Sequence, residues 1–443
     1  MKNVAVVGSS VGGLVAAAEL RTRGFDVTIF EAGKSIGGMY GKVDTPFGVQ
    51  ELGMHVLYLS AAHYDHLCAI FGFNAFHTWN GPTVDLASHR NFGCNFFDSV
   101  YPDLRGHADV KTIRREVLAR KSATHRPANA LEAVVCRFGE EAGSEVYAPI
   151  LKKLWKTEAD LLTAESIHCF FDLRRVVLWD REEADRVKAD PWFDEVVANP
   201  DQRHPHSEVF GGRMAARFKN LTGDFGESVN AWLERTGIRL QLAKPAEIRD
   251  GRLWVSGEPL DDQFQACIVA TPVPTITPNI RNSMELLELS IFYFRLKSPL
   301  GNAFPAYYML LHEGHLMSSR IVHYDAYSLE GDAERLPVLS VEVLHPVGLR
   351  PSVEKIAAEV TVALPMATIS ESFVFPSSLK VPIPSLKNGS LIDEATVGMQ
   401  DRFEKGALYF TGMRTDKGIF FSHHTIGVAH ESALDCTRRF ACN

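Results

Sequence analysis

The chain has 443 residues, of which 46% are hydrophobic and 23% charged, and this composition excludes disordered, collagen-like and coiled-coil classes. Lys and Arg total 46 while Asp and Glu total 54, and the resulting formal net charge of −8 argues against a protein that binds nucleic acid through a basic face. The length predicts two or three domains at about 150 residues each.

Membrane and disulfide signals are both weak in this sequence. No run reaches the roughly 18 apolar residues that a membrane-spanning helix needs. The 7 cysteines show neither CxxC nor zinc-finger spacing. We therefore expect reduced thiols, no metal site and a cytoplasmic protein.

The first thirty residues predict a strand–turn–helix–strand unit. Val4–Val7 is a short apolar run typical of a strand buried on both faces of a parallel sheet. Leu14–Arg23 is rich in Ala and Leu, and Gly24 supplies a helix end. Phe25–Phe30 predicts a second strand. A signal peptide is the alternative for this N-terminus, but the second strand favours a βαβ unit.

The turn between strand and helix carries a dinucleotide-binding pattern with one departure. Gly8, Ser10 and Gly13 occupy the GxGxxG positions, with Ser10 in place of the second glycine. The first glycine permits the tight turn, the last allows close packing, and the helix N-terminus attracts phosphate. Ser10 is small enough for its position and is a potential phosphate ligand. Glu31, 18 residues past Gly13, is expected to bind ribose hydroxyls and to disfavour a 2′-phosphate.

A second glycine pair, Gly37-Gly38, closely follows Glu31. Here the sequence resembles the FAD-dependent amine oxidase superfamily, which includes monoamine oxidases, protoporphyrinogen oxidases, phytoene desaturases and UDP-galactopyranose mutases. In that family an Arg commonly follows the glycine pair. Met39 stands there in this chain, so one usual phosphate contact is not predicted.

The resemblance continues towards a candidate catalytic histidine. Phe47–His55 is similar to the family strand that returns to the flavin and ends in Gly-x-His. This similarity implies that His55 lies beside the flavin ring, although a hydrogen-bonded core histidine would show the same pattern. Residues 140–166 resemble a substrate-domain segment of the family, but an amphipathic helix pair explains their periodicity equally well.

The middle of the chain resembles the family's return to the cofactor domain. The charged, Pro- and His-rich segment 182–207 is expected to be a loop or crossover. Gly211–Met214 matches the re-entry motif, and Ala246 is the expected contact to the adenine half of the cofactor. Residues 266–274 predict another buried strand with a Thr-Pro stop.

Three further apolar runs predict strands at Leu289–Leu296, Tyr307–Leu311 and Leu336–Leu344. Arg320 lies between them, in a segment that resembles a family strand whose Arg contacts substrate phosphates. A guanidinium suits an anion because its planar fork binds two oxygens. Arg320 is therefore a candidate substrate ligand, and a surface ion pair is the alternative.

The C-terminal segment carries the second most specific resemblance. Ala407–Gly412 is similar to the family's last strand and its glycine turn, with Met413 where an acid often stands. The resemblance implies a flavin-contacting helix after it, predicted here over residues 428–439. His423 and His424 are expected near the flavin edge or the substrate, and His423 joins His55 as a candidate proton-transfer group.

The resemblance implies an α/β fold: a Rossmann-type FAD-binding domain with a parallel sheet and an inserted α+β substrate domain. We expect the first domain to comprise residues 1–60, 205–275 and 400–443, and the second 61–204 and 276–399. The expected catalytic residues are His55, His423 and Arg320. The expected cofactor ligands are Gly8, Ser10, Val11, Gly12, Gly13, Glu31, Ala32, Gly37, Gly38, Met39, Gly53, Met54, Ala246, Gly412, Met413, Thr425 and Ile426.

The leading functional hypothesis is an FAD-dependent oxidoreductase that removes hydride from a C–N or C–C bond of a small molecule. The first alternative is a UDP-galactopyranose mutase-like flavoenzyme that performs no net oxidation. A flavin-binding structural protein and an NADH-using dehydrogenase without flavin are weaker alternatives. The oligomeric state is left open, with a homodimer among the options. Aromatic residues that are candidates for lining a pocket, or for packing in the core, are Tyr58, Tyr64, Phe71, Phe73, Phe76 and Trp79.

Overall fold

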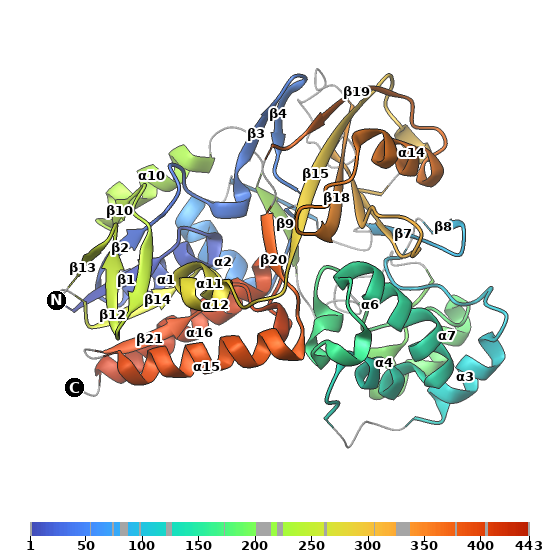
Figure 1. The fold of residues 1–443 in the computed structure, drawn as a ribbon, viewed down its shortest axis with the longest axis horizontal. Helices are drawn as coiled ribbons and strands as arrows, with labels where there is room; N and C mark the ends of the chain where they lie inside the picture. Colours follow the sequence, from blue (N-terminus) through green and yellow to red (C-terminus); the bar gives the residue numbers. More distant parts are fainter. Residues whose placement is uncertain are drawn as a thin grey trace.

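The strands of the chain form two main sheets, with a helical region beside the larger one (Figure 1). The computed structural model describes residues 2–53, 55–72, 75–79, 87–96, 99–120, 126–171, 173–200, 214–218, 225–260, 264–304, 306–324, 337–376, 379–403 and 406–441. None of the helices within these ranges is both long and apolar enough to cross a membrane.

The first sheet is parallel throughout and combines strands from the N-terminal, middle and C-terminal parts of the chain. Its strands, in spatial order, are β10 (Arg239–Gln241), β2 (Asp26–Phe30), β1 (Asn3–Val7), β14 (Ala266–Val269) and β21 (Ala407–Phe410). The strand–turn–helix–strand unit predicted at the N-terminus is confirmed as β1, α1 (Val11–Thr22) and β2. Because β1 is flanked on both sides, its apolar run is buried at every position from Val4 to Val7.

Side chains of this sheet alternate between two cores. Val4, Val6 and Ile29 point into a core formed with helices, whereas Ala5 and Val7 point to the opposite face. The helices of the first core are α1, α2 (Ala61–Phe71), α10 (Phe225–Thr236) and α16 (Ser422–Ala441). The opposite core is formed by β11 (Ala246–Arg249), β12 (Arg252–Val255), α11 (Val273–Ile276) and α15 (Leu386–Arg402), with β13 (Glu258–Pro259) and α12 (Pro278–Arg281) beside them. Thus α2 and most of α15, which the expected boundaries assign to the substrate domain, pack with the parallel sheet.

The second sheet has eight strands and is mostly antiparallel. Its order is β19 (Ile369–Val374), β15 (Leu286–Leu296), β18 (Val338–Pro346), β17 (Arg320–His323), β16 (Tyr308–Leu311), β7 (Ala87–Asn91) and β8 (Cys94–Phe96), with β20 (Leu379–Pro382) also paired to β15. Its two faces again alternate. Phe292, Phe294 and Met309 pack under α14 (Val353–Ala363), whereas Leu289 and Leu310 face the helical region.

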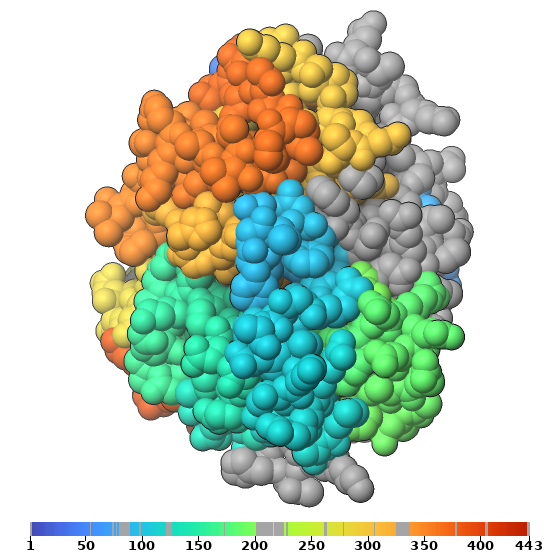
Figure 2. All heavy atoms as spheres, turned by 90° about the vertical axis from the view of Figure 1, so that its right-hand side faces the viewer, coloured from blue at the N-terminus to red at the C-terminus, as the bar shows by residue number. Residues whose placement is uncertain are grey.

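The helical region comprises the described residues between 99 and 200. It contains α3 (Val110–Leu118), α4 (Ala130–Phe138), α5 (Glu140–Ala142), the π-helix η3 (Gly143–Tyr147), α6 (Ala148–Trp155), the 3₁₀ turns η4 (Ala159–Leu161) and η5 (Ala164–His168), α7 (Arg181–Val187) and α8 (Pro191–Val196). Figure 2 shows this region, in teal to green, below the yellow and orange parts of the large sheet. The loop predicted over 182–207 is wrong in its first half, because α7 and α8 lie there; residues 201–207 are outside the described ranges.

Short elements connect the two sheets. β3 (Lys42–Thr45) and β4 (Gly48–Glu51) form a hairpin, and β5 (Leu57–Leu59) pairs with β9 (Met214–Phe218), which also pairs with β6 (Phe76–Trp79). The C-terminal helix α16 begins at Ser422, six residues before the predicted start at 428. This earlier start places His423 and His424 in the first turn of a helix instead of in a loop.

Candidate active site

The glycine-rich turn after β1 is tightly packed against neighbouring backbone. Gly8 has a φ of +98°, which side-chain-bearing residues rarely adopt. A Cβ on Gly13 would lie 2.2 Å from the Gly8 carbonyl oxygen. Ser10 caps α1: its Oγ accepts from the Gly13 amide at 3.4 Å and donates to the Ala270 carbonyl at 3.1 Å. Its single hydroxyl proton is therefore used to join the turn to the residue after β14.

Glu31 follows β2 and its carboxylate points back to this turn. Oε2 accepts from the backbone amide of Ser9 at 2.8 Å and from its hydroxyl at 2.7 Å. Oε1 accepts from the Gly33 amide at 2.7 Å. A carboxylate has about four acceptor positions, so these three bonds fix its orientation and leave capacity on a partly exposed group.

The second glycine pair connects the turn to residues that line a cavity, Met39 and Tyr40. Gly37 adopts a left-handed conformation (φ +106°), and its amide donates to the Ser9 carbonyl at 3.2 Å. The next residues form the 3₁₀ turn η1 (Gly38–Tyr40), in which Met39 is half exposed and Tyr40 buried. Burial raises the pKa of Tyr40 above its ordinary range, so the phenol stays neutral.

The start of α16 reaches the same place from the C-terminal end. A Cβ on Gly12 would lie 3.2 Å from the Thr425 carbonyl oxygen, so α1 and α16 approach closely at their first turns. Ile426 is fully buried between them and the sheet. Tyr40 hydrogen-bonds Ser422, the first residue of α16. The expected cofactor ligands from the two chain ends are thereby brought together.

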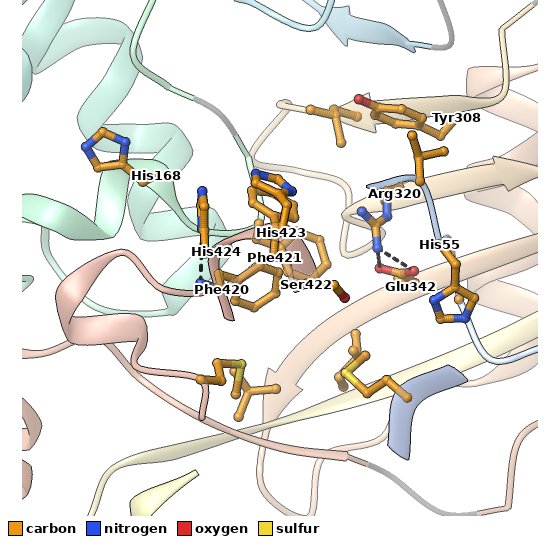
Figure 3. Close-up of a pocket in the computed structure, with 18 of the residues that line it drawn as sticks. His55, His168, Tyr308, Arg320, Glu342, Phe420, Phe421, Ser422, His423 and His424 are labelled. Atoms are coloured by element: carbon orange, nitrogen blue, oxygen red, sulfur yellow. Dashed lines mark hydrogen bonds and ion pairs between the residues drawn. The ribbon is translucent and has the colours of Figure 1, made fainter. Parts of the chain in front are cut away.

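A cavity of about 670 Å³ lies where these elements meet the large sheet and the helical region. All three expected catalytic residues, His55, His423 and Arg320, line it. Figure 3 shows His423 and His424 on one side of this space and Arg320, Glu342 and His55 on the other. Met39, Gly53 and Met413 also line the cavity, so part of the expected cofactor ligand set reaches it.

Arg320 is held by a carboxylate on the neighbouring strand. Its Nη2 lies 2.7 Å from both carboxylate oxygens of Glu342, and both residues are buried. Burial lowers the pKa of the Arg320 guanidinium, but the attraction of Glu342 outweighs it and raises the pKa overall. The guanidinium carbon also lies 5.2 Å from the centre of the Phe170 ring. The alternative of a surface ion pair is wrong, because the pair is buried in the cavity wall.

The segment that carries His55 is fixed by two buried tyrosines of the large sheet. Tyr293 donates to the Glu51 carbonyl at 2.8 Å, and Tyr324 donates to the carbonyls of Glu51 and Gly53 at 3.0 and 3.1 Å. His55 is buried, and its ring lies 4.5 Å from that of Tyr40. The large sheet therefore fixes the backbone that leads to His55, and the η1 turn contacts its ring.

Val11, Ala32, Ala246 and Gly412, which were also expected as ligands, are not among the lining residues of the cavity. Val11 is buried at the start of α1, and Ala32 is exposed after β2. Ala246 begins β11 and packs against the parallel sheet. Gly412 follows β21, where a Cβ would lie 2.2 Å from the Thr271 carbonyl oxygen. Met54, and residues 211–213 of the predicted re-entry motif, lie outside the described residues.

Several residues of the cavity wall were not predicted from the sequence. They include Tyr40, His168, Tyr308, Glu342 and Phe420. One of them carried a usable signal, because Glu342 is the lone charge in the apolar run 336–344 and a carboxylate buried in a strand needs a partner. Of the aromatic candidates, Tyr58 lines the cavity, whereas Tyr64, Phe71 and Phe76 pack in the core of the parallel sheet; Phe73 and the Trp79 side chain are outside the description.

Comparisons with known proteins agree with this geometry. Residues 6–72 match the family described as NAD(P)-binding Rossmann-like domain. A 39-residue stretch is 56% identical to a flavin-containing monooxygenase, FMO GS-OX-like 6, of Arabidopsis thaliana; it covers 9% of this chain and 8% of that protein, so the chain spans under a tenth of this curated relative.

Solved structures match over nearly the full length. Reduced UDP-galactopyranose mutase superposes with a TM-score of 0.68 at 15% identity, covering 100% of this chain and 95% of that one. Wild-type putrescine oxidase bound to putrescine gives 0.57 at 13% identity, covering 98% of both chains. The predicted fold class is confirmed: the chain has a Rossmann-like domain and shares the overall fold of UDP-galactopyranose mutase and putrescine oxidase.

Proposed function

We propose that this chain is an FAD-dependent oxidoreductase that oxidises a C–N or C–C bond of a small molecule by hydride transfer to flavin. One observation carries the proposal: the dinucleotide-type turn and the cavity are joined through Gly37–Tyr40 and the first turn of α16. A ligand with an adenine dinucleotide at one end and a redox ring at the other would need such a connection. The fold shared with UDP-galactopyranose mutase and putrescine oxidase supports it.

The residues at the turn fit the phosphate and ribose parts of FAD. The backbone leaves no room for a side chain at Gly13, and Gly8 has a φ that side-chain-bearing residues rarely adopt. Both features suit a pyrophosphate at the N-terminus of α1. The Glu31 carboxylate is pre-oriented at the end of β2, where a ribose would lie. When bound, FAD would supply the hydride acceptor.

The protein groups around the cavity would orient the substrate and move protons. His55 and His423 are the candidates for proton transfer, since a neutral imidazole can accept a proton near physiological pH. Tyr40 stays neutral and supports the His55 ring from one side. The apolar wall, which includes Leu289, Ile291 and Phe170, would exclude water from the reacting bond. The six described cysteines are free thiols, which fits the proposed cytoplasmic location.

A mutase-like reaction without net oxidation is the second candidate. It is favoured by the TM-score of 0.68 to UDP-galactopyranose mutase and by a buried Arg320 in the cavity wall. Anaerobic mixing with candidate substrates separates the two. If the substrate bleaches the flavin absorbance, the oxidoreductase is supported; activity that appears only after dithionite reduction supports the mutase-like reaction instead.

The cofactor assignment is tested by colour and by Glu31→Gln. The purified protein is expected to absorb near 370 and 450 nm, roughly, as bound flavins do. Glu31→Gln should weaken FAD binding about tenfold or more, because a charged hydrogen-bond acceptor is lost. The control is Glu182→Gln on the exposed surface of α7. A colourless protein that takes up no FAD would refute the assignment, and equal affinity of both variants would refute the role of Glu31.

A further inference from the structure

Basic side chains outnumber acidic ones around the cavity of a chain that is acidic overall. Among the described lining residues, the basic ones are Arg137, Arg174, Arg175, Arg320 and Lys380, and the carboxylates are Glu195 and Glu342. Glu342 neutralises Arg320. The other described charged groups of the wall are four cations and one carboxylate, a local excess of three positive charges. The formal charge of the whole chain is −8, so this local excess is opposite to the chain average.

Three of these cations come from the helical region. Arg137 is in the last turn of α4, and its guanidinium lies 5.9 Å from the centre of the Trp192 ring of α8. Arg174 and Arg175 precede Val176, whose amide donates to the Val196 carbonyl at 3.0 Å. The segment of Arg174 and Arg175 is therefore tied to α8, the helix that also packs under Arg137. All three side chains are partly buried, so their charges act on a ligand with less screening than at an open surface.

The rest of the wall is largely uncharged. Val100, Phe170, Leu289, Ile291 and Leu310 contribute apolar surface between the helical region and the large sheet. Such a wall suits an apolar or uncharged body. A diamine or other cationic substrate would meet like charges at the helical side, because Glu195, the one carboxylate among the described lining residues of that side, is exposed.

We propose that the substrate carries an oxyanion, a carboxylate or a phosphate, on an apolar body, and that Arg137, Arg174 and Arg175 form the oxyanion subsite. This inference rests on the proposed function, since it assumes that the cavity is the substrate site. Guanidinium groups suit it because each offers paired donors to two oxygens. Arg320 adds a further donor: its Nε is buried and has no hydrogen-bond partner among the described residues.

Matched probes test the charge preference directly. The FAD-loaded protein is titrated, in a phosphate-free buffer, with 4-phenylbutyrate, phenyl phosphate and 4-phenylbutylamine, using calorimetry and the flavin absorbance. At least one of the two anions should bind about tenfold or more tightly than the amine, because charged hydrogen bonds are gained in one case and repulsion in the other. Which anion binds better distinguishes carboxylate from phosphate. An amine that binds as tightly as both anions, or no binding of either anion at millimolar concentration, overturns the proposal.

A variant locates the subsite. The double substitution Arg174→Gln/Arg175→Gln should weaken the preferred anion about tenfold or more while leaving the amine no weaker. Arg186→Gln, an exposed arginine on α7, is the matched control. If the double variant binds the anion as the wild type does, the subsite is wrong.

A salt titration of the wild-type protein tests the same charge preference even if the double variant does not fold. The affinity for the anion should fall as KCl is added, because salt screens the charges, and it should fall more than the affinity for the amine. Equal salt dependence overturns the proposal. A colourless protein would instead defeat the proposed function, whereas a yellow protein that prefers the amine defeats only this inference.

Discussion

At the scale of single residues, Gly13 shows most clearly how a side chain is excluded. A Cβ there would meet the Gly8 carbonyl oxygen at 2.2 Å and the Ala270 Cβ at 3.1 Å. The first contact is with backbone at the end of a buried strand, which cannot rotate away as a long side chain can. The small residue is therefore required by the packing of α1 on β1 as well as by any phosphate.

Gly13→Ala is expected to lower the free energy of unfolding by about 1–3 kcal/mol or more, because the turn must deform to admit the methyl group. Gly398→Ala is the matched control, since no atom lies within 4 Å of the Cβ position at this site in α15. That change should raise stability by about 0.5–1 kcal/mol, as alanine is the better helix residue. Urea unfolding of both variants measures the difference, and a Gly13→Ala protein as stable as the wild type would contradict the packing argument.

Arg320 and Glu342 show what a residue-level pattern can and cannot predict. The sequence marks Glu342 as the lone charge of an apolar run and places Arg320 in a short segment between such runs. Their pairing depends on the register of β17 against β18, in which Arg320 lies opposite Glu342. Strand register is set by tertiary packing, so the partner of Arg320 could not be chosen from the sequence.

At the scale of elements, α6 joins the helical region to the large sheet through a buried lysine. Lys153 donates to the carbonyl of Leu311 and, at 2.8 Å, to that of Ser318. Burial lowers the pKa of its ammonium group from 10.5 to about 7, with Lys156 contributing in the same direction. A cation is thus held where desolvation disfavours it.

The pH dependence of stability should report this lysine. Between pH 7 and 10.5 the unfolded chain binds a proton that the folded chain has lost, so the contribution of Lys153 to stability rises with pH. The slope is at most about 1.4 kcal/mol per pH unit, and the burial penalty is complete below pH 7. Lys153→Met should remove this slope, and the two orphaned carbonyls should lower the absolute stability by a constant amount.

Lys152→Met, on the exposed side of the same helix, is the control for that measurement. Urea unfolding at pH 7, 8 and 9 compares the three proteins, and the difference between variant and wild type cancels other titrating groups. Identical slopes for Lys153→Met and the wild type would show that the ammonium group stays charged in the folded protein.

The region 182–207 shows why element prediction failed locally. Its many charged residues and prolines indicated a loop. Pro191 instead occupies the first position of α8, where its missing amide costs no hydrogen bond, and Asp190 caps that helix by accepting from Trp192. Proline and charge are compatible with a short helix when they fall at its start.

At the scale of the whole molecule, the expected cofactor site joins segments from opposite ends of the chain. The turn after β1, the η1 turn and the start of α16 meet, although Gly12 and Thr425 are distant in sequence. A ligand that contacts all of them binds only the folded protein and should therefore stabilise it by mass action.

Adding FAD to the deflavinated protein at about a hundredfold excess over its dissociation constant should raise stability by about 2.7 kcal/mol. The rise would appear as an increase in melting temperature. NAD at the same concentration is the control, because a dehydrogenase without flavin would respond to NAD instead. Equal stabilisation by the two dinucleotides would favour that alternative, and no change with FAD would contradict the assembled site.

The sequence by itself determined the N-terminal βαβ unit, the glycine turn and the acidic residue after β2. These features are local, because hydrophobic periodicity and glycine positions act within about thirty residues. The expected domain boundaries and the roles of the site residues stay predictions. The family resemblance already indicated one site for His55, Arg320 and His423. The tertiary structure alone placed Arg137 and Glu342 in the same cavity, since these side chains come from separate elements that only packing brings together. It also decided the charge of that cavity, which is set by the few groups facing inward and not by the total of −8.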